Sequence, residues 1–74
     1  MNESLPQDLA ELARKKQSQG QLLEASELFE KACLFNDAAL CALLAHDASR
    51  ALVLAAFAND EVLQEQAISA LIQQ

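Results

Sequence analysis

The side chains able to do chemistry are few in this sequence, and their spacing suits none of the common sites. The chain has one His, two Cys and neither Tyr nor Trp. A Cys–His catalytic pair would need Cys41 beside His46, but two residues five apart on one helix point about 140° apart. A zinc site takes about four ligands, whereas Cys33, Cys41 and His46 offer three and form no CxxC or HxxxH pattern. We therefore expect no catalytic or metal-binding residue.

Motifs for cofactors are missing as well. A phosphate-binding loop needs several glycines, and Gly20 is the only one in the chain. Carboxylate pairs such as Glu24 with Glu27, or Glu61 with Glu65, occur routinely on acidic helices. The sequence therefore predicts a protein that is not an enzyme and has neither a cofactor nor a small-molecule substrate.

One polar group, His46, Asp47 and Arg50, interrupts the most apolar stretch, residues 38–58. On a continuous helix the three share a side, because their separations are three and four residues. Two interpretations remain open: a solvated window where the helix reaches the surface, or a polar specificity contact inside a protein interface. These charges also exclude a membrane span, since a bilayer penalises charge most at its centre.

The charge balance points away from nucleic acids and anionic membranes. Eleven Asp and Glu oppose five Lys and Arg, for a net charge of −6, which repels phosphate backbones. The only basic run, residues 14–16, is typical of a solvated helix face. No secretory signal opens the sequence, so we expect reduced thiols and a cytoplasmic location. A Cys33–Cys41 disulfide is the less favoured alternative.

Helices must carry these side chains. Ala and Leu fill twenty-nine positions, whereas Val, Ile and Thr fill four, and Pro6 and Gly20 are the only residues of their types. Sheets need β-branched residues and turn formers, so the pattern predicts an all-α fold. We expect one domain over residues 1–74, with four antiparallel helices in a compact bundle or a short stack of helical hairpins.

Capping signals set the expected bounds. Ser4 with Gln7 begins the first helix, Gly20 follows its end, and the cap pairs Asn36-Asp37 and Asn59-Asp60 begin the later helices. The second helix would run over about 21–35, the third over about 37–58 and the last over about 60–73. A break of the third helix at Asp47, which can cap a new helix, is the alternative to one continuous helix.

In the first half, residues 6–38, a turn Gly is followed by a small Ala, a large aromatic and another Ala: Gly20, Ala25, Phe29 and Ala32. This pattern resembles a tetratricopeptide repeat, a helix–turn–helix unit. Small residues let two antiparallel helices approach closely, and the aromatic fills the space between hairpins. The sequence departs from the family at Lys16, where an aromatic is usual, and at Asp37, where Pro is common. Residues 40–73 have the length of a second repeat without its pattern.

The resemblance implies a protein-binding module whose first helices line a concave groove. Its groove positions fall on Gln7, Ala10, Arg14 and Gln17. Only Arg14 is charged, so the clamp that the family uses for a carboxylate terminus is not present. In size and architecture the chain is also similar to small helical chaperones of bacterial type III secretion.

The composition itself predicts binding. A small domain buries limited apolar surface, and over half of these residues are apolar. We expect a non-enzymatic adaptor, chaperone or complex subunit, or a homodimer, which packs a partner helix onto an apolar surface. The contact residues expected on the last helix are Leu63, Ile68, Leu71 and Ile72. The alternative is an acidic inhibitor that imitates nucleic acid in a basic cleft.

Overall fold

Five α-helices account for nearly all of the part of the chain that the structure, a computed structural model, describes: residues 6–73, with side chains from residue 8 onward. Their bounds are α1 Pro6–Ser18, α2 Leu22–Lys31, α3 Phe35–Leu44, α4 Ala48–Ala58 and α5 Glu61–Gln73. The all-α prediction is confirmed, whereas the prediction of four helices is wrong.

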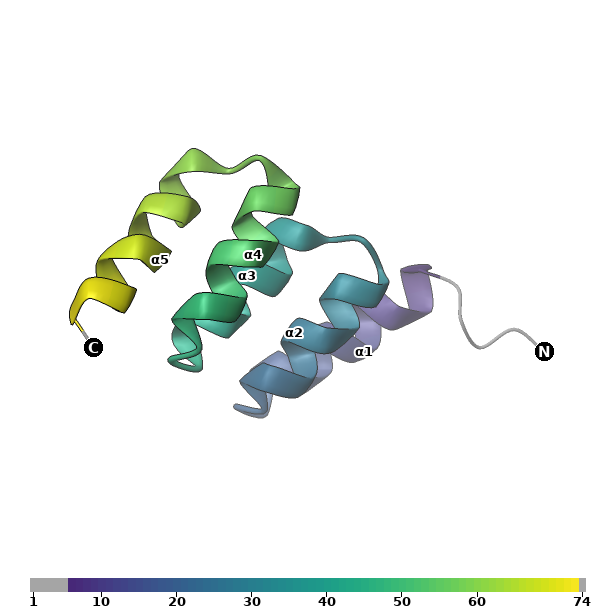
Figure 1. Ribbon diagram of the computed structural model, residues 1–74. Coiled ribbons are helices and arrows are strands. Elements are labelled where there is room, and N and C mark those ends of the chain that lie inside the picture. Colours follow the sequence, from purple (N-terminus) through teal and green to yellow (C-terminus); the bar gives the residue numbers. More distant parts are fainter. Residues whose placement is uncertain (1–5, 74) are drawn as a thin grey trace.

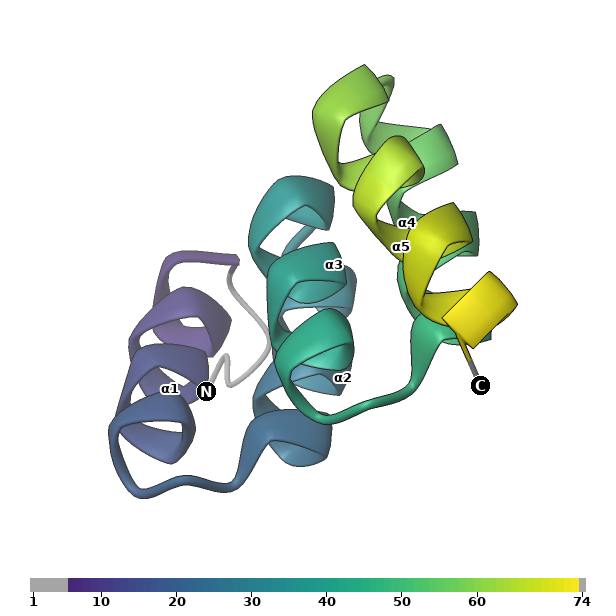
Figure 2. The ribbon, with the colours of Figure 1, turned by 90° about the vertical axis from the view of Figure 1, so that its left-hand side faces the viewer.

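The helices form a stack in which each packs against the one before it and the one after it. In Figure 1, α2 lies in front of α1 and α4 in front of α3, and α5 extends the stack at its other end. Figure 2 shows the same zigzag from the side, with α1 and α5 at opposite ends. The Cα extents are 44 × 24 × 14 Å. A thickness of 14 Å matches two layers of helices, whose axes pack about 8–10 Å apart.

A regular period sets this arrangement. The last four helices begin at Leu22, Phe35, Ala48 and Glu61, so each start lies thirteen positions after the one before. Left-handed residues precede them at the same interval: Gly20 (φ 80°), Cys33 (62°), His46 (66°) and Asn59 (59°). We call this interval the helix period. Because successive helices are antiparallel, a helix pair recurs every two periods, which makes the pair shorter than a tetratricopeptide unit.

Each of the four turns closes in the same way. The amide after the left-handed residue donates to a carbonyl five residues earlier: Gln21 to Lys16, Leu34 to Phe29, Asp47 to Ala42 and Asp60 to Ala55, at 2.8–3.0 Å. This is the Schellman motif, which satisfies carbonyls that the helix end leaves free. The chain therefore reverses direction at each turn with two or three linking residues.

The expected continuous helix over 37–58 is one of the predictions that the structure overturns. The chain leaves α3 after Leu44 and turns at His46, and Asp47 then caps α4, its Oδ1 accepting from the Arg50 amide at 3.2 Å. The break at Asp47 was the alternative interpretation. Likewise, α2 ends at Lys31 instead of near residue 35.

The two Asn-Asp cap pairs have different outcomes. Leu34 occupies the N-cap of α3 without a side-chain cap bond, so Asn36-Asp37 lies in the first turn and does not begin the helix. The cap predicted at Asp60 is confirmed, since its Oδ1 accepts from the Leu63 amide at 3.1 Å. The cap proposed for Ser4 and Gln7 lies outside the described side chains.

Small residues make the core. Ala25 and Ala38 are fully buried, as are Ala55 and Ala67, and Phe29 is the largest side chain among the fully buried ones. An Ala at a contact lets helix axes approach closely, which explains how short helices pack in a thin stack. Both cysteines are free, with Cys41 buried and Cys33 exposed.

Candidate protein-binding surface

The helical stack leaves many large apolar side chains exposed. Within residues 8–73 they are Leu12, Leu23, Leu40, Leu44, Val53, Phe57, Val62, Ile68, Leu71 and Ile72. Single exposed apolar residues are normal, but groups of them mark interaction sites. The question is therefore which of these side chains the fold places together.

The helix period shows which side of a helix meets which neighbour. Leu12 in α1 is 43% exposed, whereas Ala25 and Ala38, one and two periods later, are at 0%. In the described residues no helix precedes α1, which explains why Leu12 is exposed while its equivalents are buried. This position therefore lies on what we call the backward side of each helix, the side that faces the helix before it. By contrast, Ala13 is buried, and the helix that packs against α1 is α2. The position of Ala13 therefore belongs to the forward side of each helix, which faces the helix after it.

The forward side of α5 is uncovered. Ala42 and Ala55 lie on the forward sides of α3 and α4 and are at 0%, whereas Ile68, one period after Ala55, is 45% exposed. Leu71 and Ile72 are exposed beside it. Inside the stack the next helix covers the position of Ile68, and no helix in the described residues covers it on α5; the residues one period before Leu71 and Ile72 are half-buried and exposed, respectively.

The exposed side of α4 adjoins this surface. Ser26 and Glu30 of α2 contact Arg50 of α4, two helices later. The residues of α4 that correspond to them, two periods on, are Leu52 and Ala56. Both line an open cavity of about 430 Å³ together with Val53 and Phe57. We call the surface made by five residues the end face: Leu52, Ala56, Ile68, Leu71 and Ile72.

Two contacts fix α4 and α5 relative to α3 beside the end face. The rings of Phe35 and Phe57 stack, with centroids 5.5 Å apart and planes 25° apart. Asn36 Nδ2 donates to Asp60 Oδ2 at 2.7 Å, joining the first turn of α3 to the turn before α5. Phe57 nevertheless remains 70% exposed, so the stack holds this aromatic in place without burying it.

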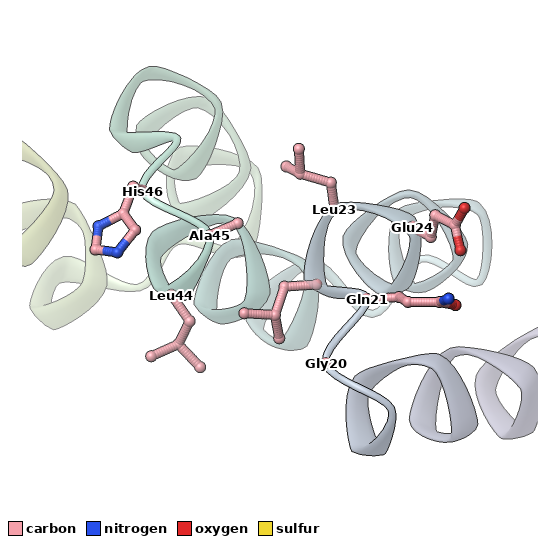
Figure 3. Close-up of a pocket in the computed structure, with 8 residues that line it drawn as sticks. Gly20, Gln21, Leu23, Glu24, Leu44, Ala45 and His46 are labelled. Carbon is pink, nitrogen blue, oxygen red and sulfur yellow. The ribbon is translucent and has the colours of Figure 1, made fainter.

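A second hollow, the loop-edge groove, lies between the α1–α2 and α3–α4 turns. It has a volume of about 520 Å³ and is lined by residues 20–24 and 44–46. In Figure 3, Leu44 lies between the two turns, with His46 and Glu24 toward opposite ends. Glu24 is engaged with Lys16 at 3.4 Å. The lining is largely apolar and pairs no thiol with a base, so the groove offers contact surface and no evident chemistry.

The polar group His46, Asp47 and Arg50 does not share one side of a helix. His46 is an exposed turn residue and Asp47 is the α4 cap. Arg50 alone reaches inward, donating from Nη2 to Glu30 Oε1 at 2.6 Å and from Nε to Ser26 Oγ at 3.2 Å. Arg50 therefore joins α4 to α2, a role that neither open interpretation contained.

Ser26 is the residue of this contact that the sequence analysis missed as a polar partner. It is fully buried, and its Oγ also donates to the Ala38 carbonyl at 2.8 Å. The helix period would have revealed it, because Ser26 lies thirteen positions after Ala13 and thirteen before Ala39, at a position where both neighbouring helices have alanine. A hydroxyl on an otherwise apolar side calls for a specific acceptor.

The other predicted contact residues are divided between the two ends of the stack. Leu63 packs partly buried against the core, and only Ile68, Leu71 and Ile72 of the α5 set are exposed. On α1, Arg14 is exposed and Gln17 is half-buried, whereas Ala10 is buried. The side chain of Gln7 lies outside the described part. The structure thus does not bring the α1 set and the α5 set together (Figure 2).

Comparisons with known proteins leave the family open. No protein-family model matches the chain, and neither curated proteins nor solved structures give a match. In the part of the chain that the structure describes, no three Asp, Glu, Cys or His side chains gather as a metal site. None of the helices described has the length and apolarity needed to cross a bilayer.

Proposed function

We propose that this protein is a non-enzymatic binding module that holds another protein through exposed apolar side chains of its helical stack. The observation that carries the proposal is the exposure of Ile68 at a position that neighbouring helices bury elsewhere in the stack. Small adaptors, chaperones and complex subunits all work in this way. We also propose that it acts in the cytoplasm, where its two free cysteines would stay reduced.

The resemblance to tetratricopeptide repeats supports this proposal in part. The α1–α2 pair is an antiparallel hairpin in which Ala25, Phe29 and Ala32 are buried, as the family pattern implies. The repeating helix pair is shorter than the family unit, however, and Ala10 is buried instead of lining a groove. We therefore carry over binding by a helical repeat surface, but not the groove of the family.

An acidic mimic of nucleic acid remains the alternative, with less support. Such a mimic needs free carboxylates in an array, yet four acidic side chains have internal partners. Glu24 pairs with Lys16 and Glu30 with Arg50, while Asp47 and Asp60 cap helices.

Affinity capture on the immobilised full chain separates the two functions. A partner held by apolar packing should resist about 1 M salt, where the Debye length is about 3 Å, and elute in mild detergent. A variant with Leu44→Ser, Phe57→Ser and Ile68→Ser removes one exposed apolar side chain from each of three helices and should retain less. Elution by salt alone, with equal retention by the variant, would favour the mimic.

A further inference from the structure

The internal contacts of the stack show what kind of element covers a forward side. At three of the four contacts the following helix presents an alanine on its backward side, Ala25 from α2, Ala38 from α3 and Ala51 from α4, whereas α5 places the half-buried Gln64 at this position. The three alanines are nearly or fully buried. A small residue is favoured at this position because it lets the helix axes approach closely. The same preference applies to an element that covers the forward side of α5.

The end face also specifies an apolar contact. Inside the stack, α4 places Arg50 over Ser26 and Glu30 of α2. At the corresponding positions of α4 the end face has Leu52 and Ala56, beside an open cavity. An arginine of the covering helix would find no side-chain acceptor at Leu52 and Ala56 and would still lose water, which costs free energy. The covering helix therefore needs an apolar side chain where α4 has arginine.

Charge gives the third specification. Glu61 and Glu65, in the N-terminal half of α5, are exposed, and α5 contains no basic residue. A helix antiparallel to α5 places its C-terminal half next to them. Lys or Arg in the last turn of that helix would complement both carboxylates and the negative end of its own dipole.

From these three specifications, and resting on the proposed function, we propose that the end face docks one amphipathic α-helix of a partner protein. This helix runs antiparallel to α5, turns a small-residue side toward Ile68 and an apolar side chain toward Leu52, and carries a basic last turn opposite Glu61 and Glu65. It extends the stack by one helix, as helix-in-groove recognition does in other proteins.

A second copy of this chain fits the end face less well. The helix that it has to offer, α1, has the apolar Leu12 on its backward side together with three exposed charged residues, Asp8, Glu11 and Lys15. Lys15 stands where Cys41 and Leu54 are buried in α3 and α4. A polar outer side is typical of a capping helix in a repeat stack, and a net charge of −6 on each copy opposes self-association.

The test uses the full chain and a dye-labelled, amidated peptide with the sequence of residues 47–60. The peptide carries Arg50→Leu, to meet Leu52, and Val53→Lys and Phe57→Lys on the side that α4 exposes. Binding is followed by fluorescence anisotropy. We expect saturable binding that Ile68→Asp weakens by about tenfold or more, since a carboxylate would be desolvated against the apolar peptide. Glu65→Lys should weaken binding by about threefold.

Leu23→Asp is the matched control, because Leu23 is 48% exposed, close to the 45% of Ile68. It lines the loop-edge groove, and its substitution should change the peptide affinity by less than about twofold. Ile68→Gln, which adds no charge, is a second variant should Ile68→Asp disturb the fold, as judged by circular dichroism.

Three results would overturn the inference: no saturable binding, equal weakening by Leu23→Asp and Ile68→Asp, or a dimer of the chain that Ile68→Asp dissociates in light scattering. The last result would assign the end face to a second copy. If a partner obtained by affinity capture binds the Ile68→Asp protein unchanged, protein binding stands and the end-face inference alone fails.

Discussion

At the scale of single residues, Arg50 is a polar side chain that joins two non-adjacent helices of the stack. It bonds to Glu30 and Ser26, both on α2. We expect Arg50→Met, which keeps the aliphatic stem, to lower the free energy of unfolding by about 1 kcal/mol. Ser26 keeps its bond to the Ala38 carbonyl, so no buried hydroxyl is left unpaired and the loss stays small.

Urea unfolding with a constant m value measures this loss. Glu30→Gln is the comparison, because it keeps an oxygen acceptor and removes the charge of a half-exposed carboxylate. We expect it to cost roughly half as much as Arg50→Met. A cost for Arg50→Met indistinguishable from zero would show that the contact adds no stability and that the alanine packing alone holds α2 and α4.

The two cysteines differ in environment, and this difference predicts their reactivity. Burial, and secondarily the charge of Asp37, raise the pKa of the Cys41 thiol, whereas Cys33 is exposed. The thiolate is the reactive form, so Ellman's reagent at pH 8 should modify Cys33 first and Cys41 only as the fold opens. Denaturing urea should abolish the difference. Two equally fast phases in the folded protein would contradict the buried position of Cys41.

The same raised pKa predicts how stability depends on pH. Above the ordinary thiol pKa, about 8.5, the unfolded chain loses the Cys41 proton while the folded chain keeps it. The folded state then binds more protons, so the free energy of unfolding falls as the pH rises through that range. Cys41→Ala should remove this part of the pH dependence, and an unchanged slope in urea titrations from pH 7 to 10 would contradict it.

At the scale of elements, the left-handed turn residues determine how well each helix ends. Cys33 and His46 have φ values of 62° and 66°, a conformation that costs a non-glycine residue about 1–2 kcal/mol. We expect His46→Gly and Cys33→Gly each to raise the free energy of unfolding by about 1 kcal/mol. Asn59→Gly should gain less, because asparagine tolerates this conformation. Thermal unfolding measures all three.

Gly20→Ala is the reverse change. An added Cβ at Gly20 would meet no atom within 4 Å, so any loss comes from the backbone conformation alone. We expect it to cost about 1 kcal/mol. A gain from Gly20→Ala, or a loss from His46→Gly, would mean that these turns relax away from the left-handed region in solution.

Local sequence signals predicted part of these elements and missed the rest for a physical reason. The all-α class, the turn at Gly20 and the cap at Asp60 follow from composition and capping chemistry. The break after Leu44 has no Gly or Pro to mark it, because a Schellman turn needs one left-handed residue and His46 supplies it. The even spacing of Gly20, Cys33, His46 and Asn59 carried the missing information.

The candidate site shows the same division. Ile68, Leu71 and Ile72 could be predicted from the apolar pattern of α5 itself. The part of the end face on α4, and the bond from Arg50 to Glu30, could not, because they join residues of different helices that no local sequence pattern relates. Only the register of the stack brings such residues together.

At the scale of the whole molecule, the contacts in the described residues run mainly between successive helices, with minor contacts between α3 and α5 and, through Arg50, between α2 and α4. In such a stack, stability is nearly a sum of single-helix terms and neighbour contacts, and the ends unfold most easily. The terminal helix α5 is the one whose forward side is exposed. The element proposed to receive a partner helix is therefore also one of the two end helices, which open most easily.

Hydrogen exchange of the full chain tests this gradient. We expect amides of α3 to exchange most slowly and those of α5 faster. Ala67→Gly in α5 and Ala39→Gly in α3 each replace a buried alanine and each cost about 1 kcal/mol in helix propensity. The first should speed exchange in α5 alone, because α5 contacts only the end of the stack, whereas the second should speed it in all five helices, because α3 lies in the middle. Uniform acceleration by Ala67→Gly would instead show that the stack opens as one unit, so that α5 does not open independently of the other helices.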